Sequence, residues 1–347
     1  MKIHVAPYEH RFPLSRQLPQ ATQGKWRNCC FYEKRYFRDA DWLVVYDNPE
    51  GKIFTHLPLE RRILITAEPP EILPTYPRQY LAQFGVIVTF RNDISAPRLI
   101  KSHCALPWFV GLRRRPGVLF DLKSEGSIYD KVASTDFTAT KNQFCSVVVS
   151  DKKYVYGHER RLEFVHRLKL ALGEKLHVYG DGIHPICDKL DAIAPYKYHI
   201  VLENSQNRDY WTEKLADCYL GEAFPIYWGC PNIHDYFSPE AIKVLDLHDL
   251  ESAVVETVQF LKKDPFLERV SAVKKAKSLV LEKYNLISLI CDVVNSLSDT
   301  PKKRLLWPQV IKPWRILRQK DTLFRFGMSK LKKFLKKNES GAFHYRV

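Results

Sequence analysis

Residues 196–231, YKYHIVLENSQNRDYWTEKLADCYLGEAFPIYWGCP, combine a strand, a polar loop, a helix and a second strand. The apolar run His199–Leu202 predicts a buried strand, Thr212 is placed to cap a helix, and Phe224–Tyr227 predicts the next strand. In α/β proteins, phosphates and nucleotides bind in the loop between a strand end and a helix start. Here that loop is crowded with hydrogen-bonding side chains, which favours a nucleotide site: Glu203, Asn204, Ser205, Gln206, Arg208, Asp209, Tyr210, Glu213 and Lys214.

The charges at the start of the predicted helix point to the same site. Lys214 would lie in the first turn, near the positive end of the helix dipole, where a lysine is unfavourable unless an anion faces it. A diphosphate would supply that anion, and free backbone N–H groups would help to bind it. The alternative is that Glu213 and Lys214 are solvated surface charges, as most charged residues are. The surrounding pattern favours the binding site.

This stretch closely resembles the donor-binding motif of glycosyltransferase family 10, the α1,3/4-fucosyltransferases. The matching letters are YKY at 196–198, ENS at 203–205, DYWTEK at 209–214 and FPIYWG at 224–229, with Gly221 and Pro231. Trp211 stands where family members usually have a small or aliphatic residue. The resemblance implies that this region binds a nucleotide sugar, which in this family is GDP-fucose. The donor-binding residues that it implies here are Glu203, Asn204, Tyr210, Glu213 and Lys214.

A second segment of the resemblance is 150–164, SDKKYVYGHERRLEF, which follows a predicted strand and leads into a helix. Family members place an arginine three residues before an aromatic residue here, and that arginine binds the donor diphosphate. Arg161, three residues before Phe164, is the best match, and Arg160 is the alternative. Ser150 is assigned to the same donor site. Without the resemblance, both arginines would be interpreted as helix-surface charges.

A third segment, ILITAEPPE at 63–71, ends an apolar strand with Glu68 followed by Pro69. The proline favours an extended backbone at Glu68, and a carboxylate at the C-terminal end of a parallel strand faces the cleft between domains. Relatives use a glutamate at a similar strand end as the general base. The resemblance therefore assigns this role to Glu68, with Glu71 as the nearby alternative. The segment FRND at 90–93 resembles a cleft-facing family segment more loosely.

The reaction implied by the resemblance is an inverting transfer of L-fucose from GDP-fucose to a hydroxyl group. Glu68 would take the acceptor proton, while Arg161, Lys214 and the helix N-terminus stabilise the leaving diphosphate. Because these cations do the work of a metal, no metal and no cofactor beyond the donor substrate are expected; no DxD motif is obvious, and Asp181 and Asp209 stay unassigned. The residues expected to hold the sugar and ribose are Asn204, Tyr210 and Glu213.

The rest of the chain alternates short apolar runs with helical patterns, which indicates parallel sheets covered by helices. We predict α/β architecture of the GT-B type, with two Rossmann-like domains facing a cleft. The N-terminal, acceptor-side domain is expected over 1–140, with a connection near 113–140, and the nucleotide-sugar-binding domain over 141–300. The remaining predicted strands are Trp42–Tyr46, Arg62–Thr66, Val86–Thr89, Phe144–Val149, Leu176–Tyr179 and Lys243–Leu245, and the remaining helices are His158–Leu172, Leu250–Leu261 and Pro265–Tyr284.

Composition sets further limits. The 347 residues are 45% hydrophobic, which is enough for two cores, yet no run of about 18 apolar residues predicts a membrane span. The start, MKIHVAPYEHRFPL, lacks the apolar region of a secretory signal, so we expect a cytoplasmic protein. The 8 cysteines show neither CxxC pairs nor zinc-like spacing and are interpreted as reduced thiols.

The net charge of +15 is concentrated near the C-terminus. Between Lys302 and Lys337 there are 13 basic residues and one acid, Asp321, interleaved with Trp, Phe and Leu. This pattern suits an anionic membrane surface, so we predict a basic amphipathic tail over 301–347 that attaches the protein to the inner face of the cytoplasmic membrane. A passive tail and a nucleic-acid-binding tail are the less favoured alternatives. Pro308 and Pro313 interrupt any single helix.

These predictions imply an acceptor on a bacterial surface glycan, such as lipopolysaccharide, an O-antigen or a capsule precursor. Two other functions stay open at this point. The chain could be a family relative that uses a different nucleotide sugar, because the nucleotide-holding residues match better than the sugar-facing ones. It could also be a non-catalytic membrane-surface binding protein that acts through its tail.

Overall fold

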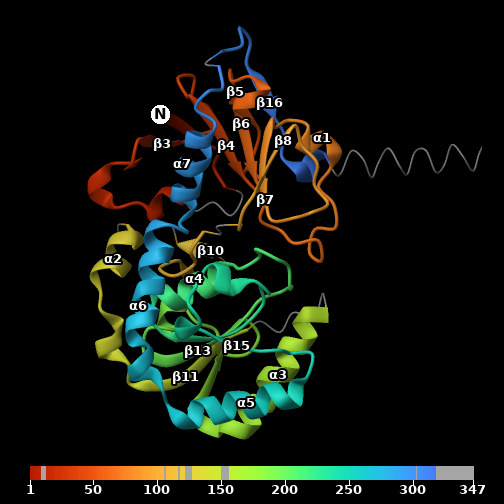
Figure 1. Cartoon of the computed structure of the whole chain (residues 1–347). Coiled ribbons are helices and arrows are strands. Elements are labelled where there is room, and N and C mark those ends of the chain that lie inside the picture. Colours follow the sequence, from red (N-terminus) through yellow and green to blue (C-terminus); the bar gives the residue numbers. More distant parts are fainter. Residues whose placement is uncertain are drawn as a thin grey trace, which may run out of the picture.

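The computed structural model describes residues 1–8, 13–104, 107–115, 118–121, 127–149, 156–301 and 303–317. Two α/β domains lie one above the other in Figure 1. The upper, N-terminal domain contains a seven-stranded sheet that is parallel except for its edge strand β2. In sheet order its strands are β2 (Lys25–Trp26), β3 (Cys29–Glu33), β1 (Lys2–Val5), β4 (Trp42–Tyr46), β6 (Arg62–Ile65), β7 (Val86–Thr89) and β8 (Arg98–Lys101).

The lower, C-terminal domain contains a five-stranded sheet in which every described pairing is parallel. Its central strands are continuous apolar runs that are buried on both faces, as expected for a parallel sheet covered by helices. Helix α3 packs against α5, and α4 packs against α6. In sheet order the strands are β12 (Leu176–Tyr179), β11 (Gln143–Val148), β13 (Tyr196–Leu202), β14 (Phe224–Trp228) and β15 (Lys243–Val244).

The connection between the sheets contains the hairpin β9 (Arg113–Arg115) and β10 (Val118–Asp121). A further antiparallel pair joins β5 (Ile53–Thr55) to β16 (Gln309–Ile311). Short 3₁₀ turns complete the framework, among which η1 (Leu14–Gln17) and η6 (Lys189–Ala192) matter below. The α-helices of the described chain are α1 (Arg78–Leu81), α2 (Ile128–Ser134), α3 (Tyr156–Leu172), α4 (Glu213–Leu220), α5 (Leu250–Lys263), α6 (Phe266–Glu282) and α7 (Leu286–Ser296).

Helix α7 packs with a different domain from the one predicted for it, because the sequence analysis placed residues 141–300 in the C-terminal domain. It follows α6 along the same side of the molecule and reaches the upper domain (Figure 1). There Leu286 and Ile290 are buried in one core with Ile3, Val44 and Ile65 of the N-terminal sheet. The segment after residue 285 therefore packs with the N-terminal domain, because its apolar side covers that sheet and not the C-terminal one.

The predicted tail also begins differently in the structure. Strand β16 pairs with β5 of the N-terminal domain, and Ile311 and Leu317 are buried in that domain's second core. Residues 309–317 are thus packed onto the protein and are not a free amphipathic segment. Residue 302 and residues 318–347, which carry most of the predicted basic stretch, lie outside the described residues. Within the part of the chain that is described, no helix is both long enough and apolar enough to span a bilayer.

The two places where the chain passes between domains are fastened together by buried polar contacts. Gln17, at the end of η1, donates from Nε2 to Asn285 Oδ1 at 3.1 Å, and the Trp108 backbone N–H donates to Gln17 Oε1 at 2.9 Å. Asn285 also caps α7. One buried side chain therefore joins the two crossings, and its polar atoms are satisfied by both.

Candidate active site

A cavity of about 420 Å³ lies between the domains, at the C-terminal ends of the parallel strands. This is the edge at which open α/β sheets bind ligands, and the volume is within the range of small-molecule sites. The N-terminal domain contributes Glu68 and Ile72 to the wall. Residues 107–112, the crossing segment that leads from the N-terminal to the C-terminal domain, contribute Phe109 and Leu112. The predicted site residues that the structure brings together in this wall are Glu68, Arg161, Asn204, Glu213 and Lys214.

The first turn of α4 is built as the sequence predicts. The Thr212 hydroxyl oxygen accepts from the Lys214 backbone N–H at 3.3 Å, which confirms Thr212 as the helix cap. Behind it lies Glu203, whose side chain is fully buried and accepts from the Thr212 backbone N–H at 2.8 Å. Lys214 Nζ lies 3.2 Å from Glu203 Oε2. Glu203 therefore lies behind the cavity wall and fixes α4, where the motif predicted a donor contact.

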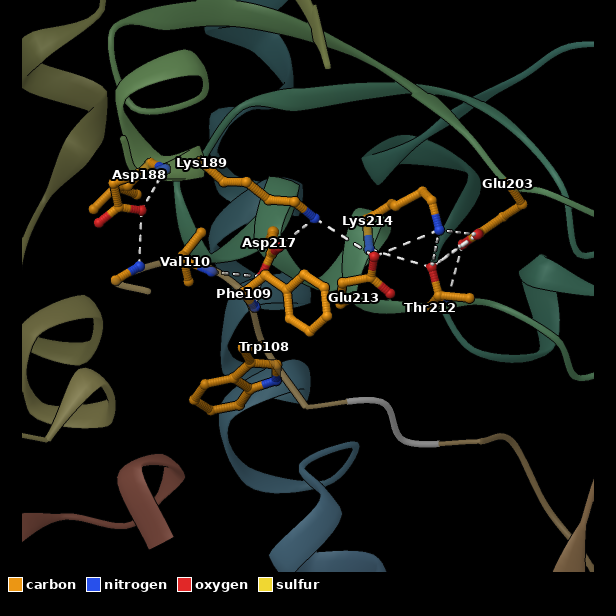
Figure 2. A network of polar contacts seen from close by, with 12 residues as sticks. Trp108, Phe109, Val110, Asp188, Lys189, Glu203, Thr212, Glu213, Lys214 and Asp217 are labelled. Carbon is orange, nitrogen blue, oxygen red and sulfur yellow. Dashed lines mark hydrogen bonds and ion pairs between the residues drawn. The ribbon is translucent and has the colours of Figure 1, made fainter. Parts of the chain in front are cut away.

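Opposite charges alternate along this helix start (Figure 2). Lys214 Nζ lies 3.5 Å from Glu213 Oε1 as well as near Glu203. Burial acts to lower the pKa of Lys214, but the two carboxylates outweigh it and raise that pKa above its ordinary value. Burial acts to raise the pKa of Glu213, but Lys214 and Lys189 outweigh it and lower that pKa to about 2. Both side chains are therefore charged at neutral pH.

Arg161 lies on α3 and lines the cavity beside the end of β13. It is buried, and its Nη1 donates to Leu202 O at 3.0 Å and to Asn204 Oδ1 at 2.7 Å. Its Nε is also buried and has no hydrogen-bond partner in the protein. A buried guanidinium N–H without a partner, beside a helix N-terminus, provides the positive charge and the unused donor that suit an anion. The alternative residue, Arg160, donates to His248 O at 2.6 Å and does not line the cavity.

Glu68 follows β6 and reaches the cavity from the N-terminal domain. Its loop is held by Arg91, which is fully buried and donates to the carbonyl oxygens of Glu68 at 3.1 Å and Leu73 at 2.6 Å. The loosely matched FRND segment thus supports the loop that carries the predicted base. The alternative base, Glu71, accepts from Asn207 Nδ2 at 3.1 Å in a contact between the two domains.

The remaining predicted residues take other places. Tyr210 is buried against Phe90, with ring centroids 5.0 Å apart, and does not line the cavity. Asp209 accepts from Asn232 Nδ2 and from the Tyr236 hydroxyl, each at 2.7 Å, so it holds the loop. Asp181 lies in the cavity wall. Ser150 lies outside the described residues.

Trp211, which departs from the family pattern, packs where the domains meet. Its ring stacks on His103 of the N-terminal domain at a centroid distance of 5.1 Å and contacts Tyr236 and Tyr284 edge-on. Burial lowers the pKa of His103 to about 4, so this imidazole is neutral at physiological pH. The bulky indole therefore contributes to the contact between domains. A small side chain at this position could not make these ring contacts.

Two functional candidates escaped the sequence analysis. Lys189 begins η6 and Asp217 lies in α4, and both line the cavity. Lys189 Nζ lies 3.1 Å from Asp217 Oδ2. Lys189 lies outside the motif stretch 196–231, and Asp217 lies within it at a position that the resemblance gives no role; their separation of 28 positions hides the contact. Among the residues that the structure describes, no group of His, Cys, Asp and Glu side chains is arranged to hold a metal ion.

Two facing α/β domains with parallel sheets and a cavity between them define a GT-B glycosyltransferase fold. Residues 138–312, half of the chain, match the profile of glycosyltransferase family 10 (fucosyltransferase), C-terminal part. The chain belongs to this family.

Individual relatives are more distant. The chain is 32% identical over 75 residues to the alpha-(1,3)-fucosyltransferase FucT of Helicobacter pylori, covering 22% of this chain and 15% of the relative. It is 31% identical over 119 residues to alpha-(1,3)-fucosyltransferase 4 of Bos taurus, covering 32% and 30%. These matches span less than a third of each curated relative. A crystal structure of an alpha1,3-fucosyltransferase with GDP-fucose aligns with a TM-score of 0.46 at 18% identity, covering 82% of this chain and 92% of that chain.

Proposed function

We propose that this protein is an inverting glycosyltransferase that transfers a sugar, L-fucose from GDP-fucose, to a hydroxyl group of a glycan. The observation that carries the proposal is a group of N–H donors in one wall of the cavity. There the buried Arg161 Nε lacks a partner in the protein, and it is joined by Lys214 and the N-terminus of α4. These N–H groups offer the diphosphate of a nucleotide sugar hydrogen-bond donors and positive charge, and Glu68 lines the cavity from the other domain.

The proposed roles follow from these positions. Glu68 takes the proton of the acceptor hydroxyl, whose oxygen attacks the anomeric carbon on the face opposite the diphosphate. The bond to the leaving phosphate oxygen breaks with its electron pair, and GDP departs. Arg161 and Lys214 offset the charge that develops on GDP, and a single displacement inverts the anomeric centre. Since cationic side chains supply this charge, we expect turnover to survive chelation of divalent metals.

A nucleotide-binding experiment tests this proposal directly. Thermal unfolding is measured with GDP, GDP-fucose, UDP, CMP and ADP. GDP and GDP-fucose at 100 times their dissociation constants are expected to add about 2.7 kcal/mol of stability. Arg161→Met should abolish that shift because it removes the partnerless guanidinium, whereas Arg160→Met, the neighbouring control, should retain it.

Other results would change the proposal in defined ways. Stabilisation by UDP or CMP alone would keep the glycosyltransferase site and replace the donor. Stabilisation by none of the nucleotides would contradict the diphosphate site. An equal loss in both arginine variants would contradict the assignment of the phosphate contact to Arg161.

The location and acceptor are a further part of the proposal. The acceptor is a bacterial surface glycan such as lipopolysaccharide, an O-antigen or a capsule precursor. The 302–337 segment, apart from its packed part 309–317, holds the enzyme at the inner face of the cytoplasmic membrane. Most of that segment lies outside the described residues. In the described part, Leu306 is 91% and Trp307 is 78% exposed, beside the basic residues Lys303 and Arg304. Exposed apolar side chains flanked by bases suit an anionic bilayer surface.

Vesicle binding provides the corresponding prediction. The protein should sediment with vesicles that contain anionic phosphatidylglycerol and stay in solution with neutral phosphatidylcholine vesicles. Removing residues 318–347 should weaken binding strongly, since each base near the surface contributes about 1 kcal/mol, and added salt should act in the same direction. Trp307→Ser should weaken it further. Equal binding to both vesicle types, or none to either, would contradict membrane attachment through these charges.

A further inference from the structure

Lys189 lies at the far end of the charged row that begins with Glu203 (Figure 2). Its Nζ is 3.1 Å from Asp217 Oδ2 and 3.5 Å from Glu213 Oε1, and it lies 4.8 Å from the centre of the Phe109 ring. The side chain is only 19% exposed. An ammonium so enclosed, with two carboxylates as neighbours, is not an ordinary surface charge.

Glu213 therefore lies between two ammonium groups, because its Oε1 is 3.5 Å from Lys214 Nζ and 3.5 Å from Lys189 Nζ. In the proposed function, Lys214 engages the donor diphosphate. An ammonium that turns toward phosphate oxygens holds the neighbouring carboxylate less strongly. Glu213 then depends on Lys189, since a buried carboxylate without a cation either takes up a proton or moves.

The other carboxylate beside Lys189 faces the segment that crosses between the domains. Asp217 is fully buried, and its Oδ1 accepts from the backbone N–H groups of Phe109 at 2.9 Å and Val110 at 3.2 Å. Next to Lys189, Asp188 Oδ1 accepts from the Gly111 N–H at 2.8 Å. The crossing segment is thus bound to the same two elements, η6 and α4, that hold the donor-site charges.

We propose that Lys189 is a positioning residue of the donor site. It holds the Glu213 carboxylate in place while Lys214 engages the donor phosphates, and through Asp217 it joins that site to the crossing segment 107–112. This inference rests on the proposed function, but one of its consequences concerns the protein without ligand. The charged groups that interact with Glu213 are Lys189 on η6, Arg161 on α3, and Lys214 and Asp217 on α4. The other titratable groups that interact with it are the buried hydroxyls of Tyr46 and Tyr210 and the buried thiol of Cys104.

Kinetics of Lys189 variants test the inference. Lys189→Met should raise the donor KM at least 10-fold, and it should move the acid limb of the pH profile of GDP affinity, to which the base Glu68 contributes little, to higher pH by at least one unit because Glu213 then titrates closer to its ordinary range. Lys189→Arg should restore both values toward wild type. Lys243→Met, which removes the ammonium of an exposed ion pair elsewhere in the same domain, should change neither.

A double variant keeps the inference testable if Lys189→Met fails to fold. Lys189→Met alone leaves the Asp217 carboxylate buried without its cation, whereas Lys189→Met combined with Asp217→Asn removes both charges and keeps an oxygen for the Phe109 and Val110 N–H groups. The double variant should fold, and it should show the same shift of the acid limb. Asp217→Asn alone keeps Lys189 beside Glu213, so its acid limb should stay near that of the wild type.

A readout without ligand separates this inference from the proposed function. The protein is labelled at the glutamate carboxyl carbon with ¹³C, and the Glu213 resonance is assigned with Glu213→Gln. In the wild type this resonance should stay at the ionised position throughout the acid range in which the protein is folded. In the Lys189→Met and double variants it should titrate at higher pH. An unchanged Glu213 titration and acid limb in both variants, even with lower thermal stability, would overturn the inference. Failure of the wild type to bind any nucleotide would overturn only the proposed function.

Discussion

Glu68→Gln is expected to lower the turnover of GDP-fucose by about 10²–10⁴-fold, which is the usual contribution of a general base. Glutamine preserves the shape of the side chain but cannot take a proton from the acceptor hydroxyl. Glu68 lines the cavity from the N-terminal domain, whereas Arg161 and Lys214, the proposed diphosphate contacts, belong to the other domain, so the affinity for GDP should change little. Initial rates with glycan acceptors ending in N-acetylglucosamine or glucose, together with GDP titrations, measure both effects.

Glu71→Gln is the matched control for this prediction. Glu71 lies three residues further along the same loop and accepts a hydrogen bond from Asn207 at 3.1 Å across the domain boundary. A glutamine oxygen can still accept that bond, so the rate should fall far less than in Glu68→Gln. A large loss in Glu71→Gln with a small one in Glu68→Gln would transfer the role of base to Glu71. Near-normal rates in both would place the base elsewhere.

Lys214→Met is expected to destabilise the fold and abolish nucleotide binding. The fully buried Glu203 carboxylate loses the ammonium that faces it, and the buried Glu213 carboxylate loses one of its two and keeps Lys189. Removing one partner of a buried ion pair costs about 3–5 kcal/mol. The free energy of unfolding in urea at pH 7, measured beside GDP affinity, reports both effects.

Combining Lys214→Met with Glu203→Gln separates the two effects. The neutral glutamine can still accept from the Thr212 N–H and no longer needs a cation, so much of the stability should return. Nucleotide binding should stay absent because the phosphate-facing ammonium is still missing. A double variant that regains both stability and GDP binding would show that Lys214 acts only as a structural partner of Glu203.

The pH dependence of stability follows from the same charges. The folded-state pKa of Glu213, about 2, lies below the ordinary glutamate value, so its contribution to stability is complete above about pH 4.3 and is lost as the pH falls through the folded-state value. The pKa of Lys214 is raised, so its contribution is present below the ordinary lysine value and is lost as the pH rises above it. The stability gap between wild type and Lys214→Met should therefore be widest near neutral pH.

Much of the secondary structure could be predicted from local patterns. The strands Trp42–Tyr46, Val86–Thr89 and Leu176–Tyr179 have the predicted bounds, and helix α3 begins two residues earlier than predicted. Strand β13 begins at Tyr196, before the apolar run at His199, because its first residues are held by pairing with β11. An apolar run between turn residues is enough to predict a buried strand, but the residue at which the strand ends depends on its pairing with the adjacent strand.

The motif also indicated which residues gather near the cavity, but it did not indicate which of them line it. Glu203 and Tyr210 stand within the same motif as Asn204 and Glu213, yet the structure places the first pair behind the wall and the second pair in it. Lys189 carried no sequence signal at all. Its contacts are 24 and 28 positions away, and such contacts exist only after η6 and α4 have packed.

The chain's local chemistry decided its apolar strands, the cap at Thr212 and the charged loop–helix junction, because apolar runs, turn residues and capping side chains act within a few residues of one another. Packing over long distances decided the rest. It returned α7 to the N-terminal sheet, buried Glu203 behind Lys214, and left Arg161 Nε without a partner in the cavity wall. These features depend on which side chains share a buried space, and only the assembled domains define that space.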